Sequence, residues 1–166
     1  MTNTEIYDKL KSAFGPVIGE WHEQTGGEYM KRLSSYADVA DTSFIRDVCL
    51  YLRDEPGLEF DSLLLLSSVD NGDKTLSVAY HLESKTMRHY IALKVTVPLD
   101  NAIVPSVTEV WSHANWQERE AWDMMGIKFL NHPDMRRILL DDDWVGHPLR
   151  KDYVYPDYYR GMKVPY

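Results

Sequence analysis

The sequence has a single cysteine, Cys49, among 166 residues. One thiol cannot form a disulfide within the chain, and an iron–sulfur cluster usually needs four thiolate ligands. We therefore expect Cys49 to be a small buried apolar residue, and we expect no metal, flavin or cluster in this chain.

Long apolar runs and positive charge are also scarce. No window approaches the roughly eighteen apolar residues of a membrane-spanning helix, and the N-terminus lacks the basic and apolar segments of a secretory signal. The chain has 18 Lys and Arg against 26 Asp and Glu, for a net charge of −8. This excess of acid argues against nucleic acid as a main partner, because phosphate binding needs a basic surface.

Motifs of nucleotide, acyl and metal chemistry are missing as well. The sequence contains no Gly-x-Gly-x-x-Gly, no phosphate-binding loop and no Gly-x-Ser-x-Gly elbow. Neither Glu-x-x-His nor His-x-x-x-His occurs. The acidic triplet 141–143 is not followed by the distal glutamate of a calcium loop.

What remains has the composition of one folded domain, with 44% hydrophobic and 27% charged residues. Residues 4–14 are predicted to form an amphipathic helix that ends at Gly15-Pro16. Segments 17–22 and 28–39 are candidate strands. A second helix, capped by Asp41 or Thr42, is predicted to bury three residues on one face: Phe44, Val48 and Leu52.

Three strands are predicted next, at 62–69, 76–82 and 91–97. Apolar and polar residues alternate in the second and third, and Asn71-Gly72 supplies turn chemistry between the first two. Alternation with a period of two residues, together with short connections, predicts an antiparallel meander. One face of this sheet would pack against helices, and the other would be more exposed to water. His81 and His89 are expected on the wetter face.

The stretch from Asn115 onward is predicted to open as a helix. Asn115 suits the N-cap, Glu118 stands where it completes a capping box, and Gly126 suits the residue after the helix. Beyond Gly126 the chain is rich in loops, prolines and tyrosines. We predict an α+β domain, residues 1–146, with an antiparallel or mixed β-sheet, helices packed on one face and an extended C-terminal arm, residues 147–166.

This stretch also carries a specific pattern, whose segments are Glu118-Arg119-Glu120, Asp123-Met124-Met125, His132 and Arg136-Arg137-Ile138-Leu139. The pattern resembles the signature of the 30 kDa-type C subunit of NADH:quinone oxidoreductase, respiratory complex I. The similarity continues through Trp144 to Tyr153 and covers roughly residues 40–155.

The resemblance implies a non-catalytic structural subunit in the peripheral arm of a proton-pumping NADH:quinone oxidoreductase. Family members hold no cofactor; they brace the quinone-site subunit and its cluster-bearing neighbours, which contain the iron–sulfur clusters and the quinone. The implied location is peripheral, on the cytoplasmic face of the energy-transducing membrane. The partners are other subunits of that arm.

The charged residues of the signature are predicted to be structural. We expect Arg119 to be largely buried and paired with Asp123 or with an acid in the following loops. His132-Pro133 and His147-Pro148 are expected in tight turns, with the imidazoles bonded to backbone. Seven residues are candidates for contacts with neighbouring subunits: Trp144, Arg150, Lys151, Tyr153, Tyr155, Tyr158 and Tyr159. Arg136 and Arg137 are further candidates.

Two alternatives stay open. The chain is also compatible with the corresponding subunit of a related membrane-bound hydrogenase, because the bracing role is shared. From a different class, Glu118, Glu120 and Asp123 with the histidines would serve a free-standing metal-dependent hydrolase.

Overall fold

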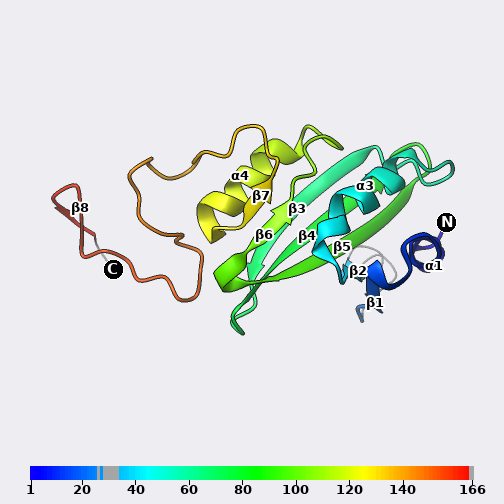
Figure 1. The fold of residues 1–166 in the computed structure, drawn as a ribbon, viewed down its shortest axis with the longest axis horizontal. Coiled ribbons are helices and arrows are strands. Elements are labelled where there is room, and N and C mark those ends of the chain that lie inside the picture. Colours follow the sequence, from blue (N-terminus) through cyan, green and yellow to red (C-terminus); the bar gives the residue numbers. More distant parts are fainter. Residues whose placement is uncertain (26, 28–33, 165–166) are drawn as a thin grey trace.

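A computed structural model describes residues 1–25, 27 and 34–164 and confirms the predicted α+β fold. Helices pack against one face of a mixed five-stranded sheet, and the chain after α4 extends away from this body (Figure 1). Among the described residues, the α-helices are α1 (Asn3–Phe14), α3 (Ile45–Asp54) and α4 (Ala114–Met125). The strands are β1 (Ile18–His22), β2 (Tyr36–Val39), β3 (Ser62–Asp70), β4 (Thr75–Ser84), β5 (His89–Pro98), β6 (Ile103–Pro105), β7 (Lys128–Leu130), β8 (Tyr158–Tyr159) and β9 (Met162–Lys163).

The sheet has the order β1-β2-β5-β4-β3. Strands β3, β4 and β5 form the predicted antiparallel meander, in which Tyr80 of β4 lies opposite Leu66 of β3 and Leu93 of β5. The sheet is mixed because β2 pairs with β5 in parallel. Alternate residues of β4 face the helices, and Leu76, Val78, Tyr80 and Leu82 are all fully buried there.

Both edges of the sheet are covered by side chains from the helices. On the β1 edge, the Tyr7 hydroxyl donates to the Gly19 carbonyl at 2.8 Å, and Lys11 donates to the Ile18 carbonyl. On the β3 edge, the Gln117 side chain accepts a hydrogen bond from the Leu66 amide. Edge groups bonded in this way are less available for pairing with another chain.

The first predicted helix is confirmed, since α1 has a complete capping box between Thr2 and Glu5. The buried face predicted for the second helix was wrong in part. Phe44 is 40% exposed, because the α-helix begins only at Ile45, after a short 3-10 turn capped by Asp41, and Ile45 takes the buried position. His89 was also misplaced. It is buried, between the N-terminal ammonium and the Gly57 carbonyl.

The predicted strand over 28–39 is observed at its end, as β2, while residues 28–33 lie outside the described residues. Four short strands of the described chain, β6 to β9, were not predicted. β6 pairs in parallel with β7, which places the chain after Gly126 beside the chain before α4. Strands of three residues show too little alternation to be recognised from sequence.

Candidate functional site

Helix α4 begins two residues earlier than the sequence suggested. Its N-cap is His113, which makes no side-chain capping bond, so Asn115 lies inside the helix and the predicted capping box is wrong. Glu118 instead faces the core and is fully buried. Its carboxylate accepts hydrogen bonds at 2.7 Å from the Ser106 hydroxyl and from the Val107 amide. Burial raises the pKa of Glu118 to about 7, although these two donors act in the opposite direction.

Arg119 is buried, as predicted, with 5% of its surface exposed. Its guanidinium donates to the Arg136 carbonyl at 3.1 Å and lies 3.7 Å from the Asp134 carboxylate. The acidic partner is therefore the acid in the following loop, not Asp123. Arg119 also lies over the ring of Trp116, at 5.0 Å from its centroid. These contacts fasten α4 to the loop that follows β7.

Helix α4 is bonded to residues 132–150 of the following chain, and we call this set of contacts the joint. Asp123 lies at its centre. Its Oδ2 accepts hydrogen bonds from the amides of residues 138, 139 and 140, at 3.1, 2.8 and 3.1 Å. Its Oδ1 accepts from Arg137 Nη1 at 2.5 Å. Burial alone raises the pKa of Asp123, but the three amides and Arg137 outweigh it and hold the pKa below its usual range. Asp123 is thus a buried carboxylate that is fully bonded.

The last carbonyls of α4 are bonded by the same part of the chain. The Gly126 amide donates to the carbonyl of residue 122, and Arg137 and His147 both donate to that of residue 123. The Leu149 amide donates to the carbonyl of residue 124, and Arg150 donates to that of residue 125. The carbonyls at a helix C-terminus normally lack partners, and cations are favourable there. Residues 147–150 therefore complete the end of α4.

Gly126 makes this close approach feasible. It has φ +77°, and a Cβ at this position would lie 2.5 Å from His147 Cδ2 and 2.6 Å from Arg150 Nη2. A side chain would both strain the backbone and displace the two residues that cap α4. The prediction that Gly126 follows the helix is confirmed, and its second role was not visible in the sequence.

Arg137 extends the joint outward. Its Nη2 donates to the carbonyls of Trp144 at 2.9 Å and Gly146 at 3.1 Å, so one side chain holds α4 and the loop of residues 144–146 together. A second contact lies at the end of β3, where Asp70 accepts from the amides of Lys151 at 2.8 Å and Gly72 at 2.9 Å. The chain after α4 is thus held at residues 144–146 by Arg137 and at Lys151 by Asp70.

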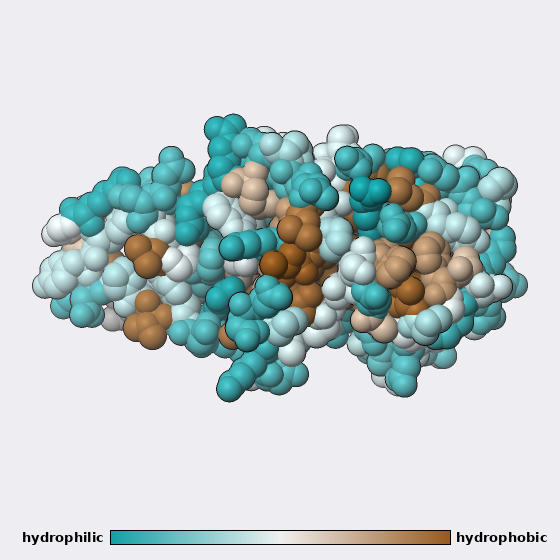
Figure 2. Space-filling model, in the orientation of Figure 1, coloured by the Kyte–Doolittle hydropathy of each residue, from teal (hydrophilic) through white to brown (hydrophobic). Residues whose placement is uncertain are grey.

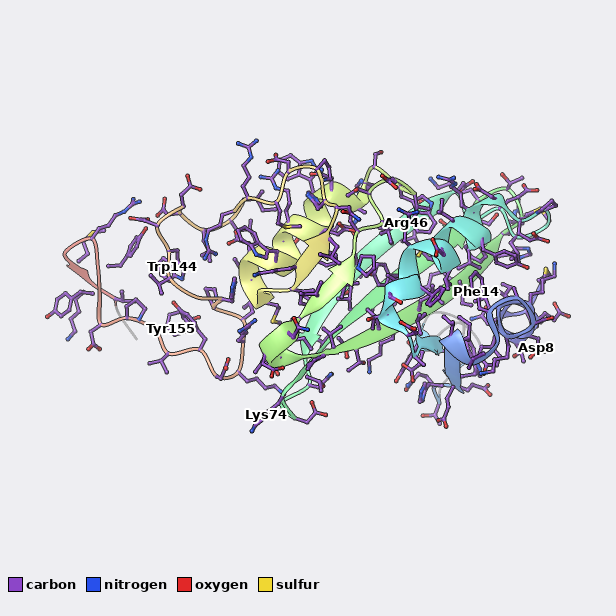
Figure 3. All side chains as sticks on the ribbon, viewed as in Figure 1. Asp8, Phe14, Arg46, Lys74, Trp144 and Tyr155 are labelled. Atoms are coloured by element: carbon purple, nitrogen blue, oxygen red, sulfur yellow. The ribbon has the colours of Figure 1, made fainter. Side chains whose placement is uncertain are left out.

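We call residues 138–164 the projecting segment. It extends away from the sheet, and the labelled Trp144 and Tyr155 lie on the side beyond α4, outside the sheet (Figure 3). At the tip of the segment, residues 141–144 contact residues 159 and 160. The rings of Trp144 and Tyr159 lie 4.8 Å apart, and the Tyr159 hydroxyl donates to Asp141 and to Asp143 at 2.9 and 2.6 Å. Arg160 also bonds Asp143.

The projecting segment exposes apolar side chains that the rest of its structure does not cover. Figure 2 shows isolated brown groups on this otherwise hydrophilic part of the molecule. The most exposed are Val145 and Val154, each at 85%. Four more are exposed by half or more: Leu139, Leu149, Tyr158 and Met162. A contiguous exposed apolar patch marks a contact with another protein more strongly than isolated groups such as these.

The predicted site residues divide into two groups. Arg119, Asp123, His132 and Arg137 lie at the joint, whereas Glu118 faces the core and bonds Ser106 and Val107, which precede α4. The His132 and His147 rings bond backbone groups in turns, as predicted.

Glu120 and Arg136 are exposed instead, and Arg136 bonds Asp134 at 3.0 Å. Arg137 is not a surface cation, because its side chain is only 11% exposed.

The residues expected at an interface are placed differently from one another. Arg150 caps α4, and Lys151 is tied to Asp70 through its backbone. Tyr153 packs over Gly146 and donates to the Val145 carbonyl at 3.2 Å. Tyr155 and Tyr158 are exposed, at 39% and 64%, whereas Trp144 and Tyr159 pair within the tip. The projecting part also includes residues 138–146, before the C-terminal arm defined from the sequence.

The carboxylates of α4 do not converge on a common point. Glu118 faces Ser106, Asp123 faces Arg137, and Glu120 is exposed to solvent. Within the described residues, no group of three His, Cys, Asp or Glu is arranged to hold a metal ion. Among these residues no helix combines the length and the apolar character that crossing a bilayer requires.

Comparison with known proteins identifies the family. Residues 39–159 match the profile of the family described as respiratory-chain NADH dehydrogenase, 30 Kd subunit. The chain belongs to this family. The matched range includes strands β3 to β5, the joint at α4 and most of the projecting segment.

Individual relatives support the same family assignment. The NADH-quinone oxidoreductase C subunit of Chlorobium phaeobacteroides is 40% identical over 162 residues, which cover 96% of this chain and 93% of that protein. Its counterpart in a Roseiflexus species is 50% identical over 154 residues, covering 92% and 84%. Another, from Chloroherpeton thalassium, is 39% identical, and the match covers 64% of its length.

Two solved structures share the fold. One is the trypsin-resistant fragment (1-134) of Nqo5, with a TM-score of 0.62, 20% identity and coverage of 81% of this chain and 99% of that one. The other is a chain of the membrane-bound sulfane sulfur reductase, an archaeal respiratory membrane complex. Its TM-score is 0.70 at 23% identity, with coverage of 91% and 85%. At these identities the likeness is one of fold.

Proposed function

We propose that this protein is a structural subunit in the peripheral arm of a complex I-type NADH:quinone oxidoreductase. In this role it braces neighbouring subunits, chiefly the quinone-site subunit, and performs no chemistry itself. The chain holds no cofactor of its own, and the iron–sulfur clusters and quinone belong to its partners. It sits on the cytoplasmic face of the membrane as a peripheral component. Membership of the 30 kDa subunit family supports the complex, and the projecting segment supports the bracing role.

The observation that carries the bracing role is the contrast between the two ends of the projecting segment. At its base, Asp123, Arg137 and Arg150 fix the segment to α4 through buried bonds. At its far end, Val154 and Tyr158 are largely exposed. A segment that is held in place before binding loses less conformational entropy when a partner covers its apolar groups. The segment is therefore suited to contact another protein.

Truncation tests this proposal. A tagged chain ending at Asp152 keeps Asp123, Arg137 and Arg150, so we expect it to fold as a monomer but to be lost from the complex during mild-detergent purification. The full chain with the same tag is the control and should co-purify with the other subunits. Equal retention of both chains in the complex would show that residues 153–164 make no important contact.

A second candidate is the corresponding subunit of a related membrane-bound complex, such as a hydrogenase. The likeness in fold to a chain of the sulfane sulfur reductase favours keeping it. The same purification separates the two, because the co-purifying complex either oxidises NADH with quinone as acceptor or does not. The metal-dependent hydrolase is not proposed further, since its three carboxylates lie apart.

A further inference from the structure

Glu118 is a buried carboxyl group with an incomplete set of partners. None of its surface is exposed, and its two hydrogen-bond donors, the Ser106 hydroxyl and the Val107 amide, are both neutral. An ionised carboxylate has about four acceptor sites. A buried charge is costly unless it is paired and fully bonded, as Asp123 is with Arg137. Among the described residues no cationic side chain bonds Glu118, so its neutral form is favoured.

The groups that face Glu118 from the neighbouring elements bring no positive charge. Cys49 of α3 and Tyr80 of β4 are both fully buried. Burial, and then the negative charge of Glu118, raise the pKa of both groups, so both are neutral at physiological pH. The Tyr80 hydroxyl has no hydrogen-bond partner among the described residues. The carboxyl therefore lies in an apolar, uncharged interior.

Two hydroxyl groups lead from this interior toward the surface. Ser106 Oγ lies 2.7 Å from Glu118 Oε2 and 2.8 Å from Thr108 Oγ1. In the second contact either hydroxyl can donate. Ser106 is buried, whereas Thr108 is partly exposed. Carboxyl, serine and threonine thus form a continuous hydrogen-bonded row from the core to a partly exposed residue.

We propose that Glu118, Ser106 and Thr108 form a proton-binding site, in which Glu118 holds an exchangeable proton and the two hydroxyls carry it to and from solvent. This goes beyond the proposed function, because it concerns a ligand, the proton, that the chain binds by itself. The rise in the pKa of Glu118 to about 7 supports it.

Release of the proton involves three transfers that balance. The Glu118 O–H bond breaks as an O–H bond forms at Ser106 Oγ. The original Ser106 proton passes to Thr108 Oγ1, and the original Thr108 proton passes to a water molecule. Ser106 and Thr108 end neutral, Glu118 ends as a carboxylate that accepts from Ser106, and the water gains one proton. Uptake follows the reverse order.

Carbon-13 NMR of the full chain tests the binding site. With glutamate labelled at the side-chain carboxyl carbon, the Glu118 signal should titrate with a midpoint near neutral pH. Glu120, exposed on the same helix, supplies the reference signal for a solvated carboxyl. A Glu118 midpoint below about pH 5, close to the ordinary glutamate value, would overturn the site.

A variant tests the path. Thr108→Val removes the outer hydroxyl and leaves both donors to Glu118 in place, so the midpoint should stay where it is. Exchange between the protonated and ionised Glu118 signals should change from fast to slow on the chemical-shift timescale. Thr4→Val, which removes an exposed threonine hydroxyl from α1, should leave exchange fast. If Thr108→Val exchanges as fast as the unaltered chain, the path through Ser106 and Thr108 is wrong. Neither result depends on whether the chain joins a complex.

Discussion

Arg137 Nη1 lies 2.5 Å from Asp123 Oδ1, and both side chains are withdrawn from solvent, with exposures of 11% and 0%. The pair joins the C-terminal turn of α4 to a loop fourteen residues later in the chain. Buried ion pairs offset their desolvation only when the remaining acceptors and donors are also bonded. Here three amides complete Asp123, and three carbonyls, those of Asp123, Trp144 and Gly146, complete Arg137. The pair is therefore the structural centre of the joint.

Breaking this pair should be costly. Asp123→Ala leaves the Arg137 charge and three amides without their acceptor, so the free energy of unfolding should fall by about 3–5 kcal/mol. Denaturant unfolding measures the loss. Arg136→Ala is the matched control, because the Arg136 side chain is 72% exposed and its removal should change stability by less than about 0.5 kcal/mol. Equal losses for the two variants would contradict the central role of Asp123.

Gly126 and Gly161 offer a second matched pair. Both have a positive φ, +77° and +79°, but a Cβ at Gly161 would meet nothing within 4 Å. Gly161→Ala should therefore show only the backbone cost, on the order of 1 kcal/mol. Gly126→Ala should show that cost plus the displacement of His147 and Arg150, and should lose clearly more. Amide exchange at Leu149 reports the displacement, because its amide bonds the Met124 carbonyl. Unchanged protection there would argue against the close-approach role.

Much of the fold follows from period and turn chemistry. The alternation in β4 and β5 and the Asn71-Gly72 turn predict the meander, and spacing by four predicts α1. Phe44 was misplaced because helical spacing fixes a face only once the first helical residue is known. His89 was misplaced because its burial depends on two distant groups, the N-terminus and Gly57.

The joint was predictable only in outline. Helical spacing puts Arg119 and Asp123 within reach of each other, yet each bonds a residue after Gly126. Nothing in a linear pattern ranks Arg137 above Arg119 as the partner of Asp123. The predicted capping box was wrong for a similar reason. The pattern Asn-x-x-Glu fits a helix N-terminus, but the Glu118 carboxylate instead accepts hydrogen bonds from Ser106 and Val107.

The raised pKa of Glu118 should make stability depend on pH in a defined direction. Its pKa rises from 4.5 to about 7 on folding, so the associated stability is fully present below pH 4.5 and is lost as pH rises through 7. The pKa values of His132 and His147 are lowered, first by burial, so these groups act in the opposite direction and lose stability as pH falls. A comparison with Glu118→Gln isolates the glutamate.

The unaltered chain should lose about 2.5 kcal/mol more than Glu118→Gln between roughly pH 5 and pH 8. Urea unfolding at both pH values measures this difference. Glu120→Gln, which removes an exposed carboxyl from the same helix, should follow the unaltered chain. Identical pH profiles for Glu118→Gln and the unaltered chain would show that Glu118 keeps an ordinary pKa in the fold.

A substitution on the projecting segment can separate a role in binding from a role in folding. Val154 is 85% exposed, so Val154→Asp should change the free energy of unfolding of the isolated chain by less than about 0.5 kcal/mol. If a neighbouring protein in the complex covers Val154, the same change buries a carboxylate at the contact and should weaken retention, which quantitative co-purification measures. Met87→Asp, in the exposed turn between β4 and β5, is the control and should be retained normally. Normal retention of Val154→Asp would place this part of the segment in solvent within the assembled complex, and the contact would then have to lie elsewhere on the chain.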